Sequence, residues 1–374
     1  MTAAGAVALN RCRGCGSDDL TPVLDLGEQP VCDHFPAVLD PGPDPRWPLA
    51  LVLCGGCALV QLSHVSPAPE EPLAVESATL QAHAEAVTAR LLARIDAEPG
   101  VRVREFASHH GGSWSAALVA GGCELVEADA DVVVDNQSII HAEQLEPELA
   151  QRVAALADDG LLVIEFHHAY EQLVQAQFDT VRHGHPLYFS LHSWSAACGR
   201  HGLSVVDAWR EDVFGGCLVV LARRGRHEPT DAVREILAAE RAVDLTRPQG
   251  YAHLAEHTHR TVTDLRDHIT AAHTAGRAVA AYGAGSKAVT LLGVAGLGPD
   301  EIPIVADLSP GKHGRRIPGA GIPIVSPDQL VAAHPDDVVV LTWDIAPEVV
   351  QQLRSAGLTD ARYVAPLPRL ANVD

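Results

Sequence analysis

Residues 278–288 read AVAAYGAGSKA, an apolar run that passes through two glycines into the start of a helix. A strand, a glycine turn and a helix N-terminus form a phosphate-cradling geometry, because glycine lets the backbone approach the anion and the helix N–H groups point at it. Lys287 adds a positive charge, and Asp307 follows Gly283 by 24 residues, close to the spacing of a ribose-binding acid. The stretch predicts half of a nucleotide-binding α/β unit.

Two further features lie near this turn in the sequence. Residues 309–316, SPGKHGRR, are the basic patch of an acidic chain and fit diphosphate binding through Lys312, Arg315 and Arg316. The alternative is a solvated basic loop. Trp343 follows the apolar run 338–342, another position at the edge of a ligand cleft. Lys287 and Lys312 are the only lysines in the chain, and both fall in these motifs.

Apolar runs alternate with helical patterns through most of the chain, which indicates α/β architecture. We expect a small cysteine-rich domain over residues 1–66, a doubly wound α/β domain over 67–226, a helical linker over 227–276 and a smaller α/β domain over 277–374. Between Ser77 and Ala97, apolar residues recur at helical spacing and predict an amphipathic helix.

Two CxxC pairs in the first domain predict a structural zinc site. The pairs are Cys12 with Cys15 and Cys54 with Cys57. Four thiolates suit tetrahedral Zn²⁺, and the spacing makes unmetallated thiols or a redox pair the weaker alternatives. The other four cysteines are isolated, which is typical of buried filler residues.

Composition excludes several classes of partner. The chain has 374 residues, 47% of them hydrophobic, and a net charge of −21, which nucleic acid or an anionic membrane would repel. The N-terminus has no basic segment before an apolar run, and no apolar stretch reaches about 18 residues. We therefore expect a soluble cytoplasmic protein. The sequence leaves the oligomeric state open, with a monomer acceptable.

Several of the 20 histidines follow predicted strands of the middle domain, at the edge where ligands bind. His141 follows the run 132–134, and His167 and His168 follow the run 161–166. His183 and His185 lie in the next loop. Clustered histidines favour acid/base chemistry, with a metal-binding HxH pair as the weaker alternative.

The cofactor half of the middle domain is short. After the apolar run 101–106, Gly111 and Gly112 stand where a cofactor-binding turn is expected. The stretch from Val101 to Val134 holds only 34 residues, which is room for one crossover where two are needed. We therefore predict that one strand–helix unit, which normally supplies a ribose-binding carboxylate, is missing.

Together these motifs resemble the sugar C-methyltransferases that act on nucleotide-linked keto-deoxysugars in natural-product biosynthesis, including antibiotic biosynthesis. The resemblance covers nearly the whole chain. Beyond the CxxC pairs, it rests on residues 23–30, 164–168, 177–180, 282–287, 312–314, 318–319 and 343–344. It implies a zinc-binding domain, a shortened Rossmann-like methyltransferase domain and a C-terminal half-Rossmann domain, with the nucleotide sugar held between the last two.

The resemblance also implies roles for particular residues. The catalytic set is His185, His141, His183, Arg182, Tyr188 and Gln137, where Arg182 replaces a family tyrosine and Gln137 a family asparagine. The substrate-binding set is His168, Lys287, Lys312, Arg315, Arg316 and Trp343. In the family, a base removes the proton beside a ketone, and the enolate attacks the methyl group of S-adenosylmethionine.

The departures from the family fall on the methyl donor's site. An acidic glycine-rich loop is replaced by residues 108–112, which leaves Gly111 and Gly112 to bind cofactor, and residues 70–80 lack the family's tyrosine. The sequence favours retained enolisation with lost or altered methyl transfer, so that the enzyme epimerises, isomerises or eliminates. The alternatives are an S-adenosylmethionine-dependent C-methyltransferase with a shortened cofactor site and a non-catalytic partner protein. Hydride transfer is disfavoured because a second Rossmann half is lacking.

Overall fold

An antiparallel sheet forms most of the N-terminal part of the computed structural model, which describes residues 5–40, 42–66, 78–107 and 111–374. Its strand order is β10-β4-β3-β2, with β2 at Leu20–Pro30, β3 at Arg46–Cys54, β4 at Val60–Leu62 and β10 at Leu187–Tyr188. Leu24 and Leu26 are buried on either side of the exposed Asp25, the alternation of a half-buried strand. The short strands β1 (Val7–Ala8) and β5 (His64–Val65) pair beside it. Because β10 comes from the middle of the chain, this sheet joins the first two domains.

The middle domain is a six-stranded sheet with the order β11-β12-β9-β8-β6-β7. The strands are β6 (Arg102–Ala107), β7 (Glu124–Leu125), β8 (Ala130–Asn136), β9 (Leu156–His167), β11 (Leu203–Glu211) and β12 (Cys217–Arg224). Strands β7, β6, β8 and β9 are parallel to one another. Strand β12 runs antiparallel to β9, and β11 runs antiparallel to β12. The parallel strands therefore send their carboxyl ends to one edge.

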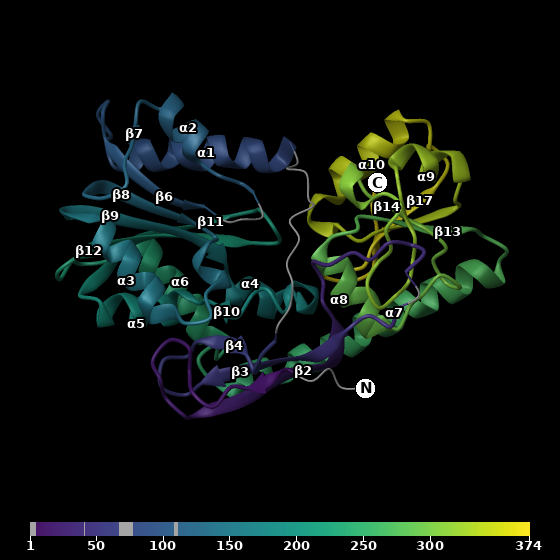
Figure 1. Ribbon diagram of the computed structural model, residues 1–374, viewed down its shortest axis with the longest axis horizontal. Helices are drawn as coiled ribbons and strands as arrows, with labels where there is room; N and C mark the ends of the chain where they lie inside the picture. Colours follow the sequence, from purple (N-terminus) through teal and green to yellow (C-terminus); the bar gives the residue numbers. More distant parts are fainter. Residues whose placement is uncertain (1–4, 41, 67–77, 108–110) are drawn as a thin grey trace.

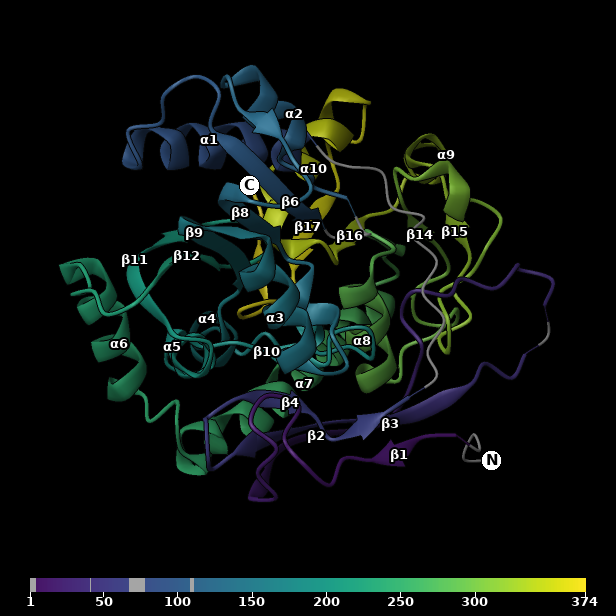
Figure 2. The same ribbon diagram turned by 60° about the vertical axis from the view of Figure 1, so that its left-hand side comes forward.

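Helices cover both faces of this sheet (Figures 1 and 2). One face carries α1 (Ala78–Arg94) and α2 (Ser115–Ala120), and the other carries α3 (Leu145–Ala155), α5 (Leu191–Arg200) and α6 (Asp231–Ala242). Alternate residues of β8 enter the two cores, since Val132 and Val134 pack with α1 and α2 whereas Val133 packs with α3 and α5. The short helix α4 (Ala169–Val174) follows β9.

The predicted shortening of the middle domain is confirmed. Strand β7 has two residues, and residues 126–129 alone connect it to β8. Strand β6 lies between them in the sheet, so no crossover helix or further strand fits this connection. The acids of this region, Glu127 and Asp129, pair with Arg104 and Arg102.

The C-terminal domain is a second six-stranded sheet with the order β15-β14-β13-β16-β17-β18. The strands are β13 (Val279–Tyr282), β14 (Val305–Ala306), β15 (Ile324–Val325), β16 (Asp337–Val340), β17 (Arg362–Ala365) and β18 (Ala371–Asn372), all parallel except β18. Its helices are α8 (Ser286–Ala295), α9 (Pro327–Ala333) and α10 (Ala346–Ser355). The turn after β13 requires glycine, because Gly283 has a φ of +99° and a Cβ there would lie 2.6 Å from Thr342 Cγ2.

The segment expected as a linker is two packed helices. Val233 and Ile236 of α6 lie in the core of the middle domain. Leu254, Leu265 and Ile269 of α7 (Ala252–Thr274) lie in a core shared by the N-terminal sheet and the C-terminal domain. Figure 1 shows α7 running along the lower side of the C-terminal domain, next to β2. The middle and C-terminal domains are therefore connected by packed helices rather than by a flexible linker.

The α/β architecture is confirmed, with strands and helices at most of the predicted runs. Among the strands of four or more residues, the sequence analysis missed β2, β11 and β17. Strand β2 contains Pro22 and Pro30, residues that usually argue against a strand. Pro22 borders a shift in the register with β3, Pro30 is the last residue of the strand, and β2 is at the edge of its sheet. Among the described helices, none combines the length and the apolar character needed to span a bilayer.

Candidate functional site

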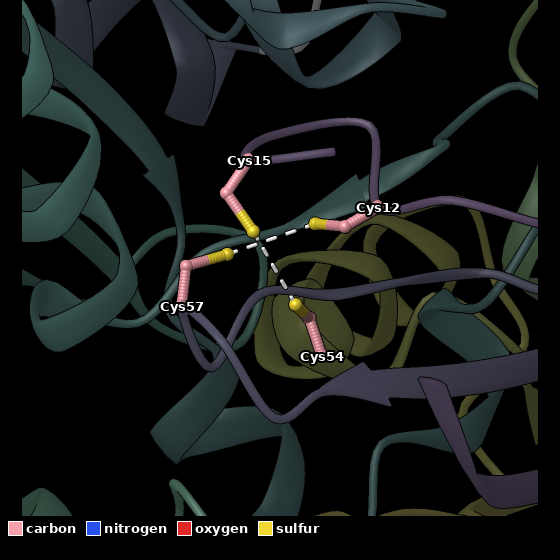
Figure 3. Close-up of side chains that lie close together, drawn as sticks. All are labelled: Cys12, Cys15, Cys54 and Cys57. Carbon is pink, nitrogen blue, oxygen red and sulfur yellow. Dashed lines mark hydrogen bonds between the residues drawn. The ribbon is translucent and has the colours of Figure 1, made fainter. Parts of the chain in front are cut away.

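A cluster of four cysteines lies at the junction of the N-terminal sheet and the middle domain (Figure 3). The four Sγ atoms all lie within 4.8 Å of one another, with Cys12 to Cys57 and Cys15 to Cys54 each at 3.6 Å. Four thiolates about 2.3 Å from one tetrahedral zinc ion are about 3.8 Å apart, so these side chains fit Zn²⁺. The predicted ligand set is therefore assembled as one closed structural site.

The first CxxC pair, here called the first zinc knuckle (residues 12–15), is linked to the middle of the chain by hydrogen bonds. Arg13, 2% exposed, donates through Nη1 to the carbonyl of Leu62 at 2.5 Å. Gln61 accepts from the backbone N–H of Arg13 at 2.8 Å and lies 3.2 Å from Cys12 Sγ. Since Leu62 N–H donates to the carbonyl of Pro186 at 3.0 Å, the metal site supports the loop that carries Arg182 and His185.

A cavity of about 230 Å³ lies where all three domains meet. Its wall contains Asp33 of the N-terminal part, the carboxyl ends of β8 and β9, the loop 182–185 and the first turn of α8. Figure 1 shows the two α/β domains side by side above the N-terminal sheet. The cavity therefore lies at the edge where the carboxyl ends of parallel strands create a ligand cleft.

Three histidines meet in this cavity. The ring of His185 is 4.7 Å from that of His141 and 5.8 Å from that of His167, measured between centroids. His167 also stacks on Phe214 at 5.4 Å. Burial, together with the positive charge of nearby cations, lowers the pKa of His167 to about 3, so this ring is neutral. The sequence analysis assigned catalytic roles to His141 and His185, whereas it placed His167 at the cleft edge without giving it a role.

Hydrogen bonds distinguish His141 from His185. The Nδ1 atom of His141 lies 2.8 Å from the carbonyl oxygen of Gly184, which can only accept, so Nδ1 carries the hydrogen. The basic nitrogen of the neutral His141 ring is therefore Nε2. The Nη2 group of Arg182 donates to Nε2 of His185, so a cation engages the lone pair of that ring.

Arg182 connects the three domains. Its Nη1 lies 3.3 Å from Asp33 Oδ2 and donates to Ser286 Oγ at 2.7 Å, while its Nη2 contacts His185. Its backbone N–H donates to the Tyr188 hydroxyl at 3.1 Å. Tyr188 is buried beneath the loop, and this burial raises the pKa of its hydroxyl. Tyr188 therefore positions Arg182 without itself lining the cavity.

A histidine and a carboxylate that the sequence analysis missed also line the cavity. His83 of α1 places Nε2 2.7 Å from Glu165 Oε1, and Gln137 donates to Glu165 Oε2 at 3.2 Å. A signal was present, because His83 lies on the apolar stripe of α1 between Leu80 and Val87. Glu165 likewise interrupts the apolar run of β9. Polar residues at buried positions of regular elements call for a functional explanation.

Lys287 and Trp343 pack against each other beside α8. Lys287 Nζ lies 2.9 Å from Asp344 Oδ2, donates to the carbonyl of Phe214 at 3.2 Å and stands 4.5 Å above the ring of Trp343. The indole N–H of Trp343 donates to Asp179 Oδ2 at 2.7 Å. Trp343 therefore supports Lys287 from behind, and Lys287 is the member of this group that reaches the cavity.

Lys312 fastens the glycine turn that follows β13. Its ammonium group donates to the carbonyl of Ala284 at 2.8 Å and lies 3.3 Å from Asp307 Oδ2. Asp307 also accepts from the backbone N–H of Ala284 at 2.8 Å. The carboxylate expected to hold a ribose is thus engaged by its own turn. Lys312 is 5% exposed and borders the cavity.

Four further residues of the predicted sets lie apart from the cavity wall. His168 is fully buried, with Nε2 2.7 Å from Glu240. His183 places Nε2 3.3 Å from the carbonyl of Trp47, and burial lowers its pKa. The other two are Arg315, which donates to the carbonyl of Phe35 at 2.7 Å, and Arg316, which pairs with Asp44. Their contacts are those of structural residues, so the basic patch splits between the cavity edge and a domain interface.

The glycine turn of the middle domain borders the cavity through Gly111 and Gly112; Ser108, His109 and His110 lie outside the described residues. The strand-end acid Glu105 accepts from the backbone N–H of Trp114 at 2.6 Å and from the hydroxyl of Ser113 at 2.7 Å. It therefore holds the start of α2.

Two protein families match the chain. A family described as "Putative zinc binding domain" covers residues 12–71, and one described as "C-methyltransferase C-terminal domain" covers residues 212–368. The C-methyltransferase NovU of Streptomyces niveus is 30% identical over 406 aligned positions that cover 96% of each chain.

Solved methyltransferase structures match part of the chain. The 1,6-didemethyltoxoflavin-N1-methyltransferase of Burkholderia thailandensis is 18% identical, covers 40% of this chain and 80% of its own, and has a TM-score of 0.31. The CurJ carbon methyltransferase is 14% identical, covers 40% of this chain and 56% of its own, and also has a TM-score of 0.31. With its zinc-binding and C-terminal domains and a relative matched along nearly its whole length, the chain belongs to the sugar C-methyltransferase family.

Proposed function

We propose that the enzyme binds a nucleotide-linked keto-deoxysugar in this cavity and moves a proton beside the ketone without transferring a methyl group. The product then arises by epimerisation, isomerisation or elimination. The observation that carries the proposal is a contrast within one cavity. Its histidines and Arg182 are assembled and hydrogen-bonded, whereas the adjoining cofactor edge lacks a strand–helix unit.

His141 is the better candidate for the base. Its Nε2 is the basic nitrogen, and the hydrogen bond from Nδ1 to Gly184 holds the ring. His185, the other candidate, has its Nε2 against Arg182. When a base takes the proton, negative charge develops on the ketone oxygen, and a fixed guanidinium group in a water-poor cavity stabilises that charge. Arg182 is suited to this role because Asp33 and Ser286 fix its orientation.

The residues do not fit a complete S-adenosylmethionine site. Such a site needs a turn that approaches the cofactor and a carboxylate after the second strand for its ribose. Gly111 and Gly112 could supply part of the turn. However, Glu105 is engaged by α2, and Glu127, the acid after β7, is 91% exposed and paired with Arg104. The adenosine side of the site is therefore largely lost.

Lys287 and the first turn of α8 are the proposed diphosphate site, because helix N–H groups and an ammonium group both favour an anion. Replacing Lys287 with Ala should weaken binding of a nucleotide sugar about tenfold, or about 1.4 kcal/mol. Isothermal calorimetry with thymidine diphosphate-linked 4-keto-6-deoxyglucose measures this change. Arg362→Ala, on the exposed side of β17, is the control. Unchanged affinity in Lys287→Ala would remove the lysine from the site.

Lys312→Ala should weaken binding and should also lower the stability of the protein, since Lys312 holds Asp307 and Ala284.

The decisive experiment places the same ketosugar in D₂O with the enzyme and without S-adenosylmethionine. We expect deuterium to enter the carbon beside the ketone at a rate far above the protein-free control, as measured by mass spectrometry. Calorimetry should show no binding of S-adenosylmethionine. Binding of that cofactor with formation of a methylated sugar would instead establish the second candidate, a methyltransferase with a shortened site, which the position of Gly111 and Gly112 favours.

A further inference from the structure

One buried ion pair in the cavity has no part in removing the proton or holding the nucleotide. His83 and Glu165 lie 2.7 Å apart, and their side chains are 11% and 1% exposed. Burial of a carboxylate costs several kcal/mol unless it is paired. The pair comes from α1 and from the end of β9, so the fold brings together residues 82 positions apart at the cavity wall.

We propose that His83 is the acid that delivers a proton to the enolate carbon, and that Glu165 and Gln137 position His83 for this step. The enzyme would then use one group to remove the proton and another to return one, which corresponds to epimerisation or isomerisation. This inference rests on the proposed function, because it requires an enolate in the cavity.

The hydrogen bonds of the pair determine which nitrogen can act. Nε2 of His83 faces Glu165 Oε1, so Nδ1 is the nitrogen able to meet a ligand, and none of the hydrogen bonds between described residues uses it. Glu165 is itself fixed twice by Gln137. The side-chain amide donates to Oε2 at 3.2 Å, and the backbone N–H donates to the carbonyl oxygen of Glu165 at 3.1 Å.

The charges around His83 favour its protonated form. Burial lowers the pKa of His83, but the hydrogen bond and charge of Glu165, with the charge of Glu211, outweigh burial and raise the pKa above its ordinary value. Glu211 lies on β11 and pairs with Arg90 at 3.1 Å. A histidine held in its protonated form is suited to act as a general acid.

The proposed reaction conserves both protons and electrons. The base takes the proton beside the ketone, the C–H electron pair becomes the enolate double bond, and the carbonyl π pair moves to the oxygen. His83 then gives its Nδ1 proton to the carbon, the enolate pair forms the new C–H bond, and the C=O bond is restored. The base leaves protonated and His83 neutral, and exchange with water resets both rings. No further reactant is consumed.

His83→Gln tests the proposal, because the glutamine amide can keep a hydrogen bond to Glu165 but cannot donate a proton as an acid. In D₂O with thymidine diphosphate-linked 4-keto-6-deoxyglucose, deuterium in recovered substrate and in product is measured separately. We expect product formation to fall at least a hundredfold, on the scale of general acid catalysis. Exchange into recovered substrate should stay within a few fold, because the base is intact.

Glu165→Gln provides a readout that a packing role would not change. Loss of the carboxylate charge should lower the pKa of His83, so the alkaline limb of product formation should move to lower pH. Glu146→Gln is the matched control, because Glu146 also pairs with a histidine, His201, at 2.8 Å but outside the cavity wall, and His201→Gln is the corresponding control for His83→Gln.

Three results are decisive. A parallel loss of exchange and product in His83→Gln would overturn the role of His83, as would exchange by the wild-type enzyme without any new product. An absence of exchange in the wild-type enzyme would instead refute the proposed function itself. The two failures are therefore distinguishable.

Discussion

His141→Ala should lower the rate of deuterium entry into the ketosugar at least a hundredfold, with little change in the affinity for the nucleotide sugar. General base catalysis contributes about 10²–10⁴-fold to rates, and His141 has the ring whose hydrogen bond to Gly184 leaves Nε2 as the basic atom. The measurement is solvent exchange by mass spectrometry, combined with calorimetry on the same preparation.

The control for this experiment is His227→Ala. His227 also places a ring nitrogen 2.8 Å from a backbone carbonyl, that of Arg224, but on the exposed surface. His185→Ala separates the two candidate bases. If His185→Ala abolishes exchange while His141→Ala retains it, then Arg182 must leave His185 Nε2 when substrate binds, and the assignment of the base is reversed.

Removal of zinc should unfold the N-terminal part of the chain and abolish activity. Structural zinc binds thiolate sites with about 10–16 kcal/mol in small domains, which is comparable with the whole stability of a typical domain, about 5–15 kcal/mol. Cys12, Cys54 and Cys57 are buried within the hydrophobic core that also contains Leu145 and Trp194 of the middle domain. The loss should therefore extend beyond the zinc knuckles.

Elemental analysis should find one zinc ion per chain, and chelation or Cys54→Ser should lower the thermal midpoint by well over 10 °C in circular dichroism. Activity should fall with the metal content, because the knuckle reaches the loop 182–186 through Leu62 and Pro186. Cys123→Ala, a buried cysteine outside the cluster, should retain its zinc. A metal-free chain that keeps both its midpoint and its activity would contradict a structural role.

Features with a local cause were predictable. The CxxC pairs indicated four thiolates for one ion, and the apolar run with a glycine turn at residues 278–288 indicated β13 and α8. The short distance from Val101 to Val134 predicted the missing unit, because a crossover needs a minimum length of chain. The strands that were missed have prolines, as β2 does, or lack a clear alternation.

The makeup of the cavity was less predictable. Histidines after strands indicated a ligand edge, and His141 and His185 do meet there. His168 comes directly after His167, the last residue of β9, but is buried against Glu240, because consecutive residues of an extended chain point to opposite sides. His83 was missed because a helix pattern shows which face is buried, but not what that face meets.

The sequence alone predicted the four-cysteine cluster, the two α/β domains and the shortened middle domain, since each depends on residue type and spacing along the chain. The tertiary structure was needed to show that Arg182 joins Asp33 and Ser286, and that His83 meets Glu165. Such contacts link residues 82 to 149 positions apart. They depend on how elements far apart in the sequence pack together, and local spacing carries no record of that packing.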